Sequence, residues 1–134
     1  MKLKGYIFSR PFMGERVPQH IQNIVIRNYC SNNNHIFFLS ASEYTMDQSF
    51  HILKQIVDSS ENIDGIVAYS LFQMPEDLSF RNKIFDKMIS KNKIFIFAVE
   101  NMILENNNDK EKINEIWEIK KNLSNALTDF SIIK

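Results

Sequence analysis

Four short apolar runs, each followed by a polar loop, constrain the fold of this chain most strongly. They cover residues 3–9, 35–40, 63–69 and 93–99, and the last run is the clearest strand candidate. Uninterrupted apolar runs of this length are typical of strands that are buried on both faces. Helical segments separate the runs, and this alternation favours right-handed crossovers between mostly parallel strands. The pattern therefore predicts an α/β fold, a three-layer sandwich whose sheet has four or slightly more strands.

Apolar residues at helical spacing follow the first three runs and return in the polar tail of the chain. Pro18 suits the first turn of the first helix, where its missing amide hydrogen is not needed. A final helix is expected over residues 109–128, on which Trp117 packs. We find neither an internal repeat nor a long linker. We therefore expect a single domain over residues 1–134, with its core over residues 3–104.

The charge balance and the single cysteine restrict the class of protein. Sixteen basic side chains balance sixteen acidic ones, which argues against a nucleic-acid partner because non-specific binders usually carry a basic excess. Cys30 cannot form an intrachain disulfide and fits a reducing compartment. The first residues lack the features of a signal peptide, and no window reaches the roughly 18 apolar residues that span a bilayer. We expect a cytoplasmic protein without a membrane span.

The sequence holds no recognisable cofactor or metal motif. A P-loop is absent, and three glycines in all are too few for the dinucleotide fingerprint. One cysteine and no close repeat of histidine and carboxylate leave no metal-binding pattern. We therefore expect neither a cofactor nor a metal.

Polar side chains stand where the apolar runs end. Because the carboxyl ends of parallel strands meet at one edge of a sheet, where open α/β sheets bind ligands, we expect these groups to converge. The convergence predicts a pocket for an anion or a polar substrate. The ligand-binding candidates are Arg10, Arg16, Gln19, Asn23, Tyr44, Ser70, Gln73 and Glu76, the catalytic candidates are Ser9, His20 and Glu43, and Glu100 and Asn101 end the fourth run.

Charge and hydrogen-bonding capacity suggest a role for each candidate. Arg10 and Arg16 could hold an anion, and Arg16 precedes a helix N-terminus that itself attracts anions. His20 could serve as a base for Ser9, and Glu43 as a general acid or base. Structural alternatives stay open, since Ser9 could satisfy backbone groups at the strand end and the loop before the helix could be merely solvated.

Four segments of the chain carry a family resemblance. They are GYIFSRPF at residues 5–12, RVPQHIQNIVIR at 16–27, LSASEY at 39–44 and GIVAYSLFQMP at 65–75. Together they resemble the small sporadic carbohydrate cluster family, over roughly residues 5–119 of this chain. That family is encoded among bacterial surface-polysaccharide genes and has no settled reaction. The resemblance implies a pathway, the biosynthesis of surface polysaccharide or lipopolysaccharide.

The order of two motifs carries a looser resemblance. Tyr6, Phe8 and Arg10 end the first run, and Gln73 and Glu76 follow the third run. This layout is similar to the catalytic domain of serine recombinases, the resolvases and invertases, in which one strand ends in Tyr-x-Arg-x-Ser and a later strand leads into Leu-x-Arg-Leu-x-Arg. Here Phe8 stands at the arginine position and Arg10 at the serine position, while Gln73 and Glu76 replace the later arginines.

These departures matter chemically. Attack on a DNA phosphodiester needs cations that stabilise the developing charge, and the two later replacements remove about two positive charges and add one negative charge. The long dimerisation helix and the DNA-binding domain of recombinases are also not expected in this chain. We infer the resolvase-like scaffold and reject the recombination chemistry.

The sequence thus favours a cytoplasmic protein of surface-carbohydrate biosynthesis. It would bind or transform a sugar, a sugar phosphate or a related anionic intermediate at the carboxyl ends of the strands, and we leave enzymatic activity open. One alternative is a non-enzymatic partner or regulatory subunit of a pathway transferase, with an exposed Phe or Trp117 of the terminal helix at the interface. A second is a degenerate serine-recombinase-like domain that binds DNA. A homo-oligomer is compatible with each.

Overall fold

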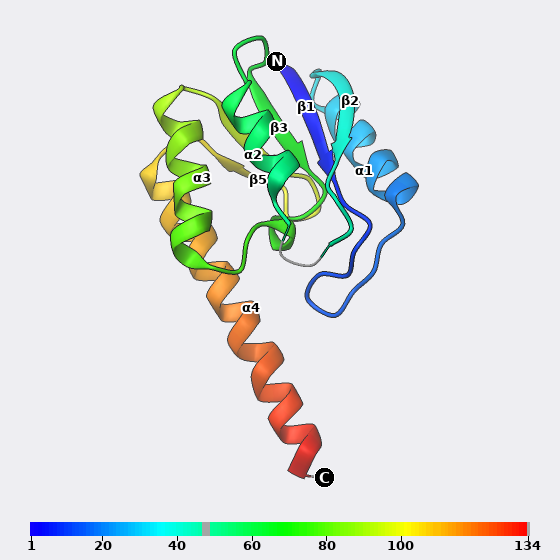
Figure 1. Cartoon of the computed structure of the whole chain (residues 1–134), viewed down its shortest axis with the longest axis vertical. Coiled ribbons are helices and arrows are strands. Elements are labelled where there is room, and N and C mark those ends of the chain that lie inside the picture. The colour runs from blue at the N-terminus through cyan, green and yellow to red at the C-terminus, as the bar shows by residue number, and fades with distance from the viewer. Residues whose placement is uncertain (47–48, 134) are drawn as a thin grey trace.

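Strands and helices alternate along the chain, as the sequence predicts. The computed structural model describes residues 1–46 and 49–133. Its elements (Figure 1) are the strands β1 (Lys2–Ile7), β2 (Ile36–Ser42), β3 (Gly65–Ala68), β4 (Ile94–Phe97) and β5 (Met102–Leu104), the α-helices α1 (Gln19–Asn32), α2 (His51–Asp58), α3 (Leu78–Ser90) and α4 (Asn107–Ile133), and the 3-10 helix η1 (Leu71–Gln73).

The five strands form one sheet in the order β2-β1-β3-β4-β5. β1 to β4 run parallel, and β5 pairs with β4 in the antiparallel direction. The predicted α/β fold with a mostly parallel sheet is confirmed.

β5 has three residues, too few for a recognisable sequence pattern. The chain turns into it at Asn101, whose φ is 52° and whose amide donates to the Ala98 carbonyl at 3.2 Å. Asn101 therefore shapes a tight turn.

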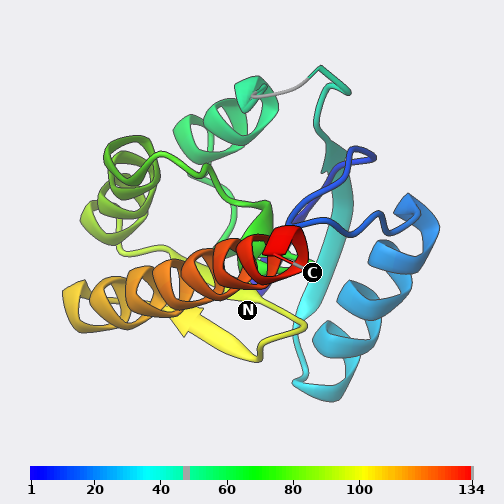
Figure 2. The ribbon, with the colours of Figure 1, turned by 90° about the horizontal axis from the view of Figure 1, so that it is seen from below.

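Helices cover both faces of the sheet, which is why the parallel strands carry apolar side chains on both sides. α1 lies on one face, where Ile26 and Cys30 join a buried cluster with side chains of β1, β3 and β4. α2 and α3 lie on the opposite face (Figure 2). There Leu53, Phe85 and, from α4, Trp117 belong to the larger buried cluster. The predicted three layers are present.

α4 is longer than the sequence predicts. It has 27 residues, a length of roughly 40 Å at the usual rise of an α-helix. Ile113 and Trp117 pack into the core near its start, and the rest of the helix projects from the body (Figure 1). α4 includes residues 109–128, where the sequence predicts a final helix. Of the helices in the described residues, none combines the length and apolar character that crossing a membrane needs.

Gly65 gives a direct test of the sheet. It lies in β3 between Leu3 of β1 and Ile94 of β4, and a methyl group added there would overlap the Ile94 carbonyl oxygen. We expect Gly65→Ala to lower the free energy of unfolding by about 1–3 kcal/mol, measured by urea denaturation, because backbone must move to admit the methyl group. Ser79→Ala, on the exposed side of α3, is the control and should change it by less than about 0.5 kcal/mol. Equal stability of the two variants would contradict the strand register described here.

Candidate functional site

The segments that follow β1 and β3 border a hollow of about 170 Å³, which we call the strand-edge pocket. Its wall also includes the residue before α2 and one side chain of α4. Three of the predicted ligand-binding residues, Arg10, Gln73 and Glu76, line it. The other lining residues used below are Phe8, Phe50, Phe72 and Trp117.

Arg10 is held firmly at the wall of this pocket. Its side chain is buried, with 8% of the residue exposed. The guanidinium carbon lies 4.4 Å from the centre of the Phe8 ring and 4.8 Å from that of Phe50. Nη1 donates to the carbonyls of Tyr44 and Met46 at 3.0 and 3.1 Å. Nη2 is buried and has no hydrogen-bond partner among the residues that the structure describes. One nitrogen of a fixed, buried cation in the pocket wall thus lacks a partner among the described residues.

Gln22 connects the segments around the pocket, and sequence reasoning missed it. It is fully buried on α1. Its Nε2 donates to the carbonyls of Phe8 and Val17 at 2.7 and 2.8 Å, and its Oε1 accepts from Gln73 Nε2 at 2.8 Å. These bonds fix the path of the chain between β1 and α1. A signal was present, because Gln22 precedes the buried Ile26 by one helical turn and so lies on the buried stripe.

Ser70 and Gln73 are engaged in hydrogen bonds that shape η1. The Ser70 hydroxyl donates to Glu100 Oε2 at 2.8 Å and accepts from the Phe72 amide at 3.2 Å. Glu100 Oε1 accepts from the Leu71 amide at 2.8 Å, and Gln73 Oε1 accepts from the Ser70 amide at 3.2 Å. The polar groups at the ends of β3 and β4 therefore meet, as the sequence predicts, and hold one another.

Glu43 is the acceptor for the start of α2. It is 4% exposed. Its Oε2 accepts from the Tyr6 hydroxyl at 3.0 Å and the Leu53 amide at 2.9 Å, and its Oε1 accepts from the Ile52 amide at 3.0 Å. The first amides of a helix have no partner within the helix, and a carboxylate there satisfies them and the helix dipole. Burial, and then the charge of Glu43, raise the pKa of Tyr6 well above its ordinary value.

Three predicted residues of the first loop lie away from the strand-edge pocket. Arg16 and His20 are exposed and Gln19 is half-exposed, and their side chains make no hydrogen bond to any other described residue. A tight turn at Met13 and Gly14, whose φ values are 50° and 77°, leads the chain outward before α1 begins. The structure therefore does not gather these three side chains with Arg10.

The remaining predicted residues have separate surroundings. Ser9 is half-buried, and within residues 1–46 and 49–133 its hydroxyl makes no hydrogen bond. Asn23 Oδ1 accepts from the Ser40 hydroxyl at 2.7 Å, which ties α1 to β2. The Tyr44 ring is stacked with His51, with ring centres 6.0 Å apart, and it is exposed. The backbone carbonyl of Tyr44, and not its phenol, takes part in holding the site.

Trp117 and Arg81 form a buried pair beside the pocket. The Arg81 guanidinium carbon lies 4.8 Å from the Trp117 ring centre, and Arg81 donates to Asn114 Oδ1 at 2.8 Å and to the Pro75 carbonyl at 3.0 Å. Burial lowers the pKa of Arg81, and the charge of Glu118 opposes this shift. Trp117 is 3% exposed, and its Nε1 is buried with no partner in the described part of the chain. Two unpartnered donors, Trp117 Nε1 and Arg10 Nη2, thus belong to residues of one pocket wall.

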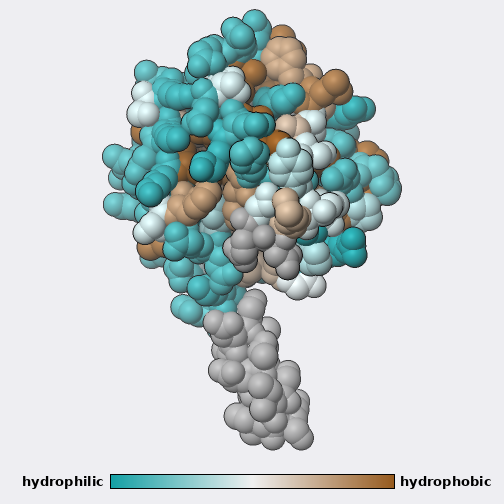
Figure 3. Space-filling view, in the orientation of Figure 1, coloured by the Kyte–Doolittle hydropathy of each residue, from teal (hydrophilic) through white to brown (hydrophobic). Residues whose placement is uncertain are grey.

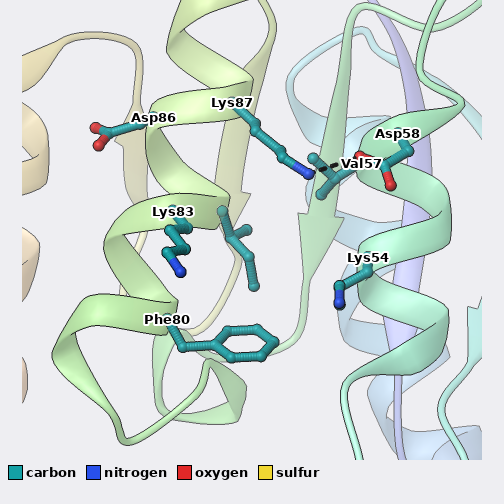
Figure 4. A pocket seen from close by; sticks show the side chains of 8 residues that line it. Lys54, Val57, Asp58, Phe80, Lys83, Asp86 and Lys87 are labelled. Carbon is teal, nitrogen blue, oxygen red and sulfur yellow. Dashed lines mark hydrogen bonds and ion pairs between the residues drawn. The ribbon is translucent and has the colours of Figure 1, made fainter.

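A larger hollow of about 390 Å³ lies between α2 and α3. Figure 4 shows Phe80 and three lysines beside it, and Figure 3 shows hydrophobic residues between mostly hydrophilic flanks on this side of the molecule. Lys87 pairs with Asp58 at 3.1 Å, and Lys54 lies 5.9 Å from the Phe80 ring centre. None of the predicted site residues lines this groove. Its charged groups are exposed, where ion pairs contribute little, so we place the candidate site at the strand-edge pocket.

Comparison with known proteins identifies the scaffold. No protein-family model matches the chain, and no curated protein matches it in sequence. Among solved structures it is similar to the N-terminal catalytic domain of TP901-1 integrase, with a TM-score of 0.61 and 15% identity over 90% of this chain and 98% of that one. It is also similar to a resolvase family site-specific recombinase from Streptococcus pneumoniae, with a TM-score of 0.60 and 10% identity over 98% of this chain and 96% of that one. The chain has the fold of these recombinase domains. At such identities the likeness concerns the fold alone, and the resemblance to the carbohydrate cluster family receives no support from these comparisons.

The Tyr6–Glu43 hydrogen bond predicts a change in alkaline stability. Below pH 10, the ordinary pKa of the phenol, Tyr6 is neutral in both the folded and unfolded chain, and its contribution is fully present. Above it the unfolded chain loses the proton while the folded chain keeps it, so this contribution falls by about 1.4 kcal/mol per pH unit. Urea unfolding between about pH 8 and pH 11 should therefore show a smaller alkaline loss for Tyr6→Phe than for wild type. Tyr44→Phe controls for loss of an exposed phenol, and parallel curves for wild type and Tyr6→Phe would contradict this assignment.

Proposed function

We propose that the chain binds a small anionic ligand in the strand-edge pocket through Arg10. The observation that carries the proposal is Arg10 Nη2, a buried cationic donor at the pocket wall without a partner among the described residues. A buried donor without an acceptor costs about 1–3 kcal/mol, and more when it is charged. A phosphate or carboxylate oxygen would remove this cost and gain a charge-assisted hydrogen bond.

The geometry around Arg10 favours binding further because the cation is already ordered. The guanidinium lies over two aromatic rings, and two carbonyls hold Nη1. Little side-chain entropy is then lost when an anion arrives. Among the described residues of the pocket wall, Glu76 is the one carboxylate. It pairs with Lys121 of α4 at 3.3 Å, which offsets its repulsion of an anion.

We propose that this anion belongs to a carbohydrate intermediate. The sequence resemblance implies surface-carbohydrate biosynthesis, and the pocket offers chemistry suited to such a ligand. Phe8, Phe72 and Trp117 belong to the pocket wall beside the cation, although little of each side chain is exposed. In small-molecule sites a few polar groups fix the ligand's orientation.

The proposed role is binding without group transfer. Glu43 is committed to α2 and Tyr6, so it does not serve as a general acid or base in this proposal. Activation of a serine needs an adjacent base, and Ser9 has no hydrogen bond to His20. Binding alone also fits a partner or regulatory subunit of a pathway transferase.

A second candidate function is DNA binding, which the fold likeness to recombinase catalytic domains favours. The charge of the projecting helix argues against DNA binding. α4, the projecting helix, carries four lysines and five acidic residues, a net charge of −1. By the sequence resemblance, Arg10 also stands where those domains carry their serine. The anion site at Arg10 therefore remains the better supported proposal.

The two candidates separate in a binding experiment with a fluorescently labelled DNA duplex. At low ionic strength, about 50 mM salt, we expect no change in anisotropy up to micromolar protein, because the chain lacks the basic excess that releases counterions. Binding that weakens steeply as salt is raised would support the recombinase-like function instead.

Arg10 variants test the anion site by isothermal titration calorimetry with inorganic phosphate and glucose 1-phosphate. Arg10→Ala should abolish detectable binding. Arg10→Lys keeps the charge but not the planar fork of donors, and it should weaken binding about tenfold, because hydrogen bonds to charged groups contribute about 1.5–3 kcal/mol.

Arg27→Ala is the matched control, since Arg27 is an exposed arginine that lies over the Phe37 ring and does not line the strand-edge pocket. Circular dichroism checks that each variant is folded. Unchanged binding by folded Arg10→Lys and Arg10→Ala would remove the proposed site.

A further inference from the structure

We propose that Trp117 Nε1 is a second ligand-recognising donor, and that the ligand is a monosaccharide phosphate bridging Arg10 and Trp117. This inference rests on the proposed function and adds to it the ligand class and a contribution from α4. The Trp117 ring packs in the core, with its centre 6.0 Å from that of Phe72. Core packing explains the burial of the ring but leaves the N–H unexplained.

The unpartnered indole N–H is the starting observation. When a tryptophan is buried, its N–H usually finds a hydrogen-bond partner. Trp117 Nε1 has none within the described residues, and the same is true of Arg10 Nη2. Both residues line the strand-edge pocket, although they lie more than a hundred positions apart in the chain. Both atoms are buried, so a ligand would reach them by displacing the side chains that cover them. A ligand with two acceptor groups bound in this way would satisfy both donors, which a lone anion held at Arg10 need not do.

The two donors differ in the acceptor that each selects. Arg10 is cationic and selects a phosphate or carboxylate oxygen. The indole N–H is neutral, so a hydroxyl or ring oxygen suffices for it. Glu76 stands on the same wall and can accept a hydrogen bond from a ligand hydroxyl. A phosphate joined to a ring bearing hydroxyl groups could bind Arg10 through the phosphate, and Trp117 Nε1 and Glu76 through oxygen atoms and hydroxyl groups of the ring.

The size of the pocket limits the ligand further. Its volume of about 170 Å³ lies below the roughly 300 Å³ at which sites for drug-sized ligands begin. A monosaccharide phosphate suits such a site better than a nucleotide sugar, whose base and second phosphate would lie outside it.

The position of Trp117 also gives binding a structural consequence. Because Trp117 belongs to α4, a ligand that contacts it and Arg10 ties the projecting helix to the segment after β1.

The chain has one tryptophan, so its indole N–H gives one cross-peak in a nitrogen-15 correlation spectrum. Addition of glucose 1-phosphate to the wild-type chain should shift this cross-peak downfield as the N–H gains an acceptor. Inorganic phosphate, which reaches only Arg10, should bind and leave it nearly unmoved. A saturating glucose 1-phosphate titration that leaves the cross-peak in place overturns the inference.

Trp117→Phe removes the N–H and keeps an aromatic ring in the core. By calorimetry we expect its affinity for glucose 1-phosphate to fall about tenfold, towards that of inorganic phosphate, while its affinity for inorganic phosphate stays at the wild-type value. An unchanged ratio of the two affinities overturns the role of Trp117 and leaves the Arg10 site standing. If the wild-type chain binds neither compound, the proposed function itself fails. Tighter binding of a nucleotide sugar than of glucose 1-phosphate overturns the ligand class.

Discussion

The burial of the Arg10 guanidinium against two phenylalanine rings organises the edge of the sheet. It joins the segment after β1 to the loop before α2, because Nη1 bonds two carbonyls of that loop. Removing a cation from water is costly unless its donors are paired. The arrangement therefore persists only if the surrounding chain is fixed independently, and Gln22 and Glu43 provide that support. Gln22 secures the backbone of Phe8, and Glu43 secures the start of α2 next to Phe50.

Several residues that the sequence analysis predicted to bind a ligand instead form hydrogen bonds that hold the surrounding chain in place. Ser70 and Glu100 bond each other, Asn23 bonds Ser40, and Glu43 accepts from Tyr6 and from α2. A polar group buried at a strand end must find partners, and its neighbours usually supply them. Arg10 Nη2 differs, because it has no hydrogen-bond partner among the described residues; the same is true of Trp117 Nε1 in the pocket wall and of Arg81 Nη2 beside it. The unpartnered donors of Arg10 and Trp117, and not polarity alone, mark the candidate site.

The sequence predicted the parts of the fold that leave a local pattern. Strands buried on both faces leave apolar runs, so the four parallel strands could be found, and the position of Arg10 at a strand end followed from them. β5 could not be predicted because three residues are too few to show the hydrophobic pattern of a strand. The role of Glu43 could not be found either, because its donors come from Tyr6 and from amides of α2 that only the folded chain brings together. Gln22 could have been found from its helical phase with Ile26.

The likeness to recombinase catalytic domains concerns the fold alone. The same sheet order supports many sites, and function is decided by the residues placed at its edges. Here the serine position of the sequence resemblance holds a buried arginine, and α4 contributes Trp117 to the pocket wall.

The most direct test of the account is a crystal structure of the chain soaked with glucose 1-phosphate at saturating concentration. The account predicts phosphate density within hydrogen-bond distance of Arg10 Nη2, with a sugar oxygen at Trp117 Nε1. A strand-edge pocket that stays free of ligand, with Nη2 bonded to water or with the phosphate bound in the groove between α2 and α3, would contradict it.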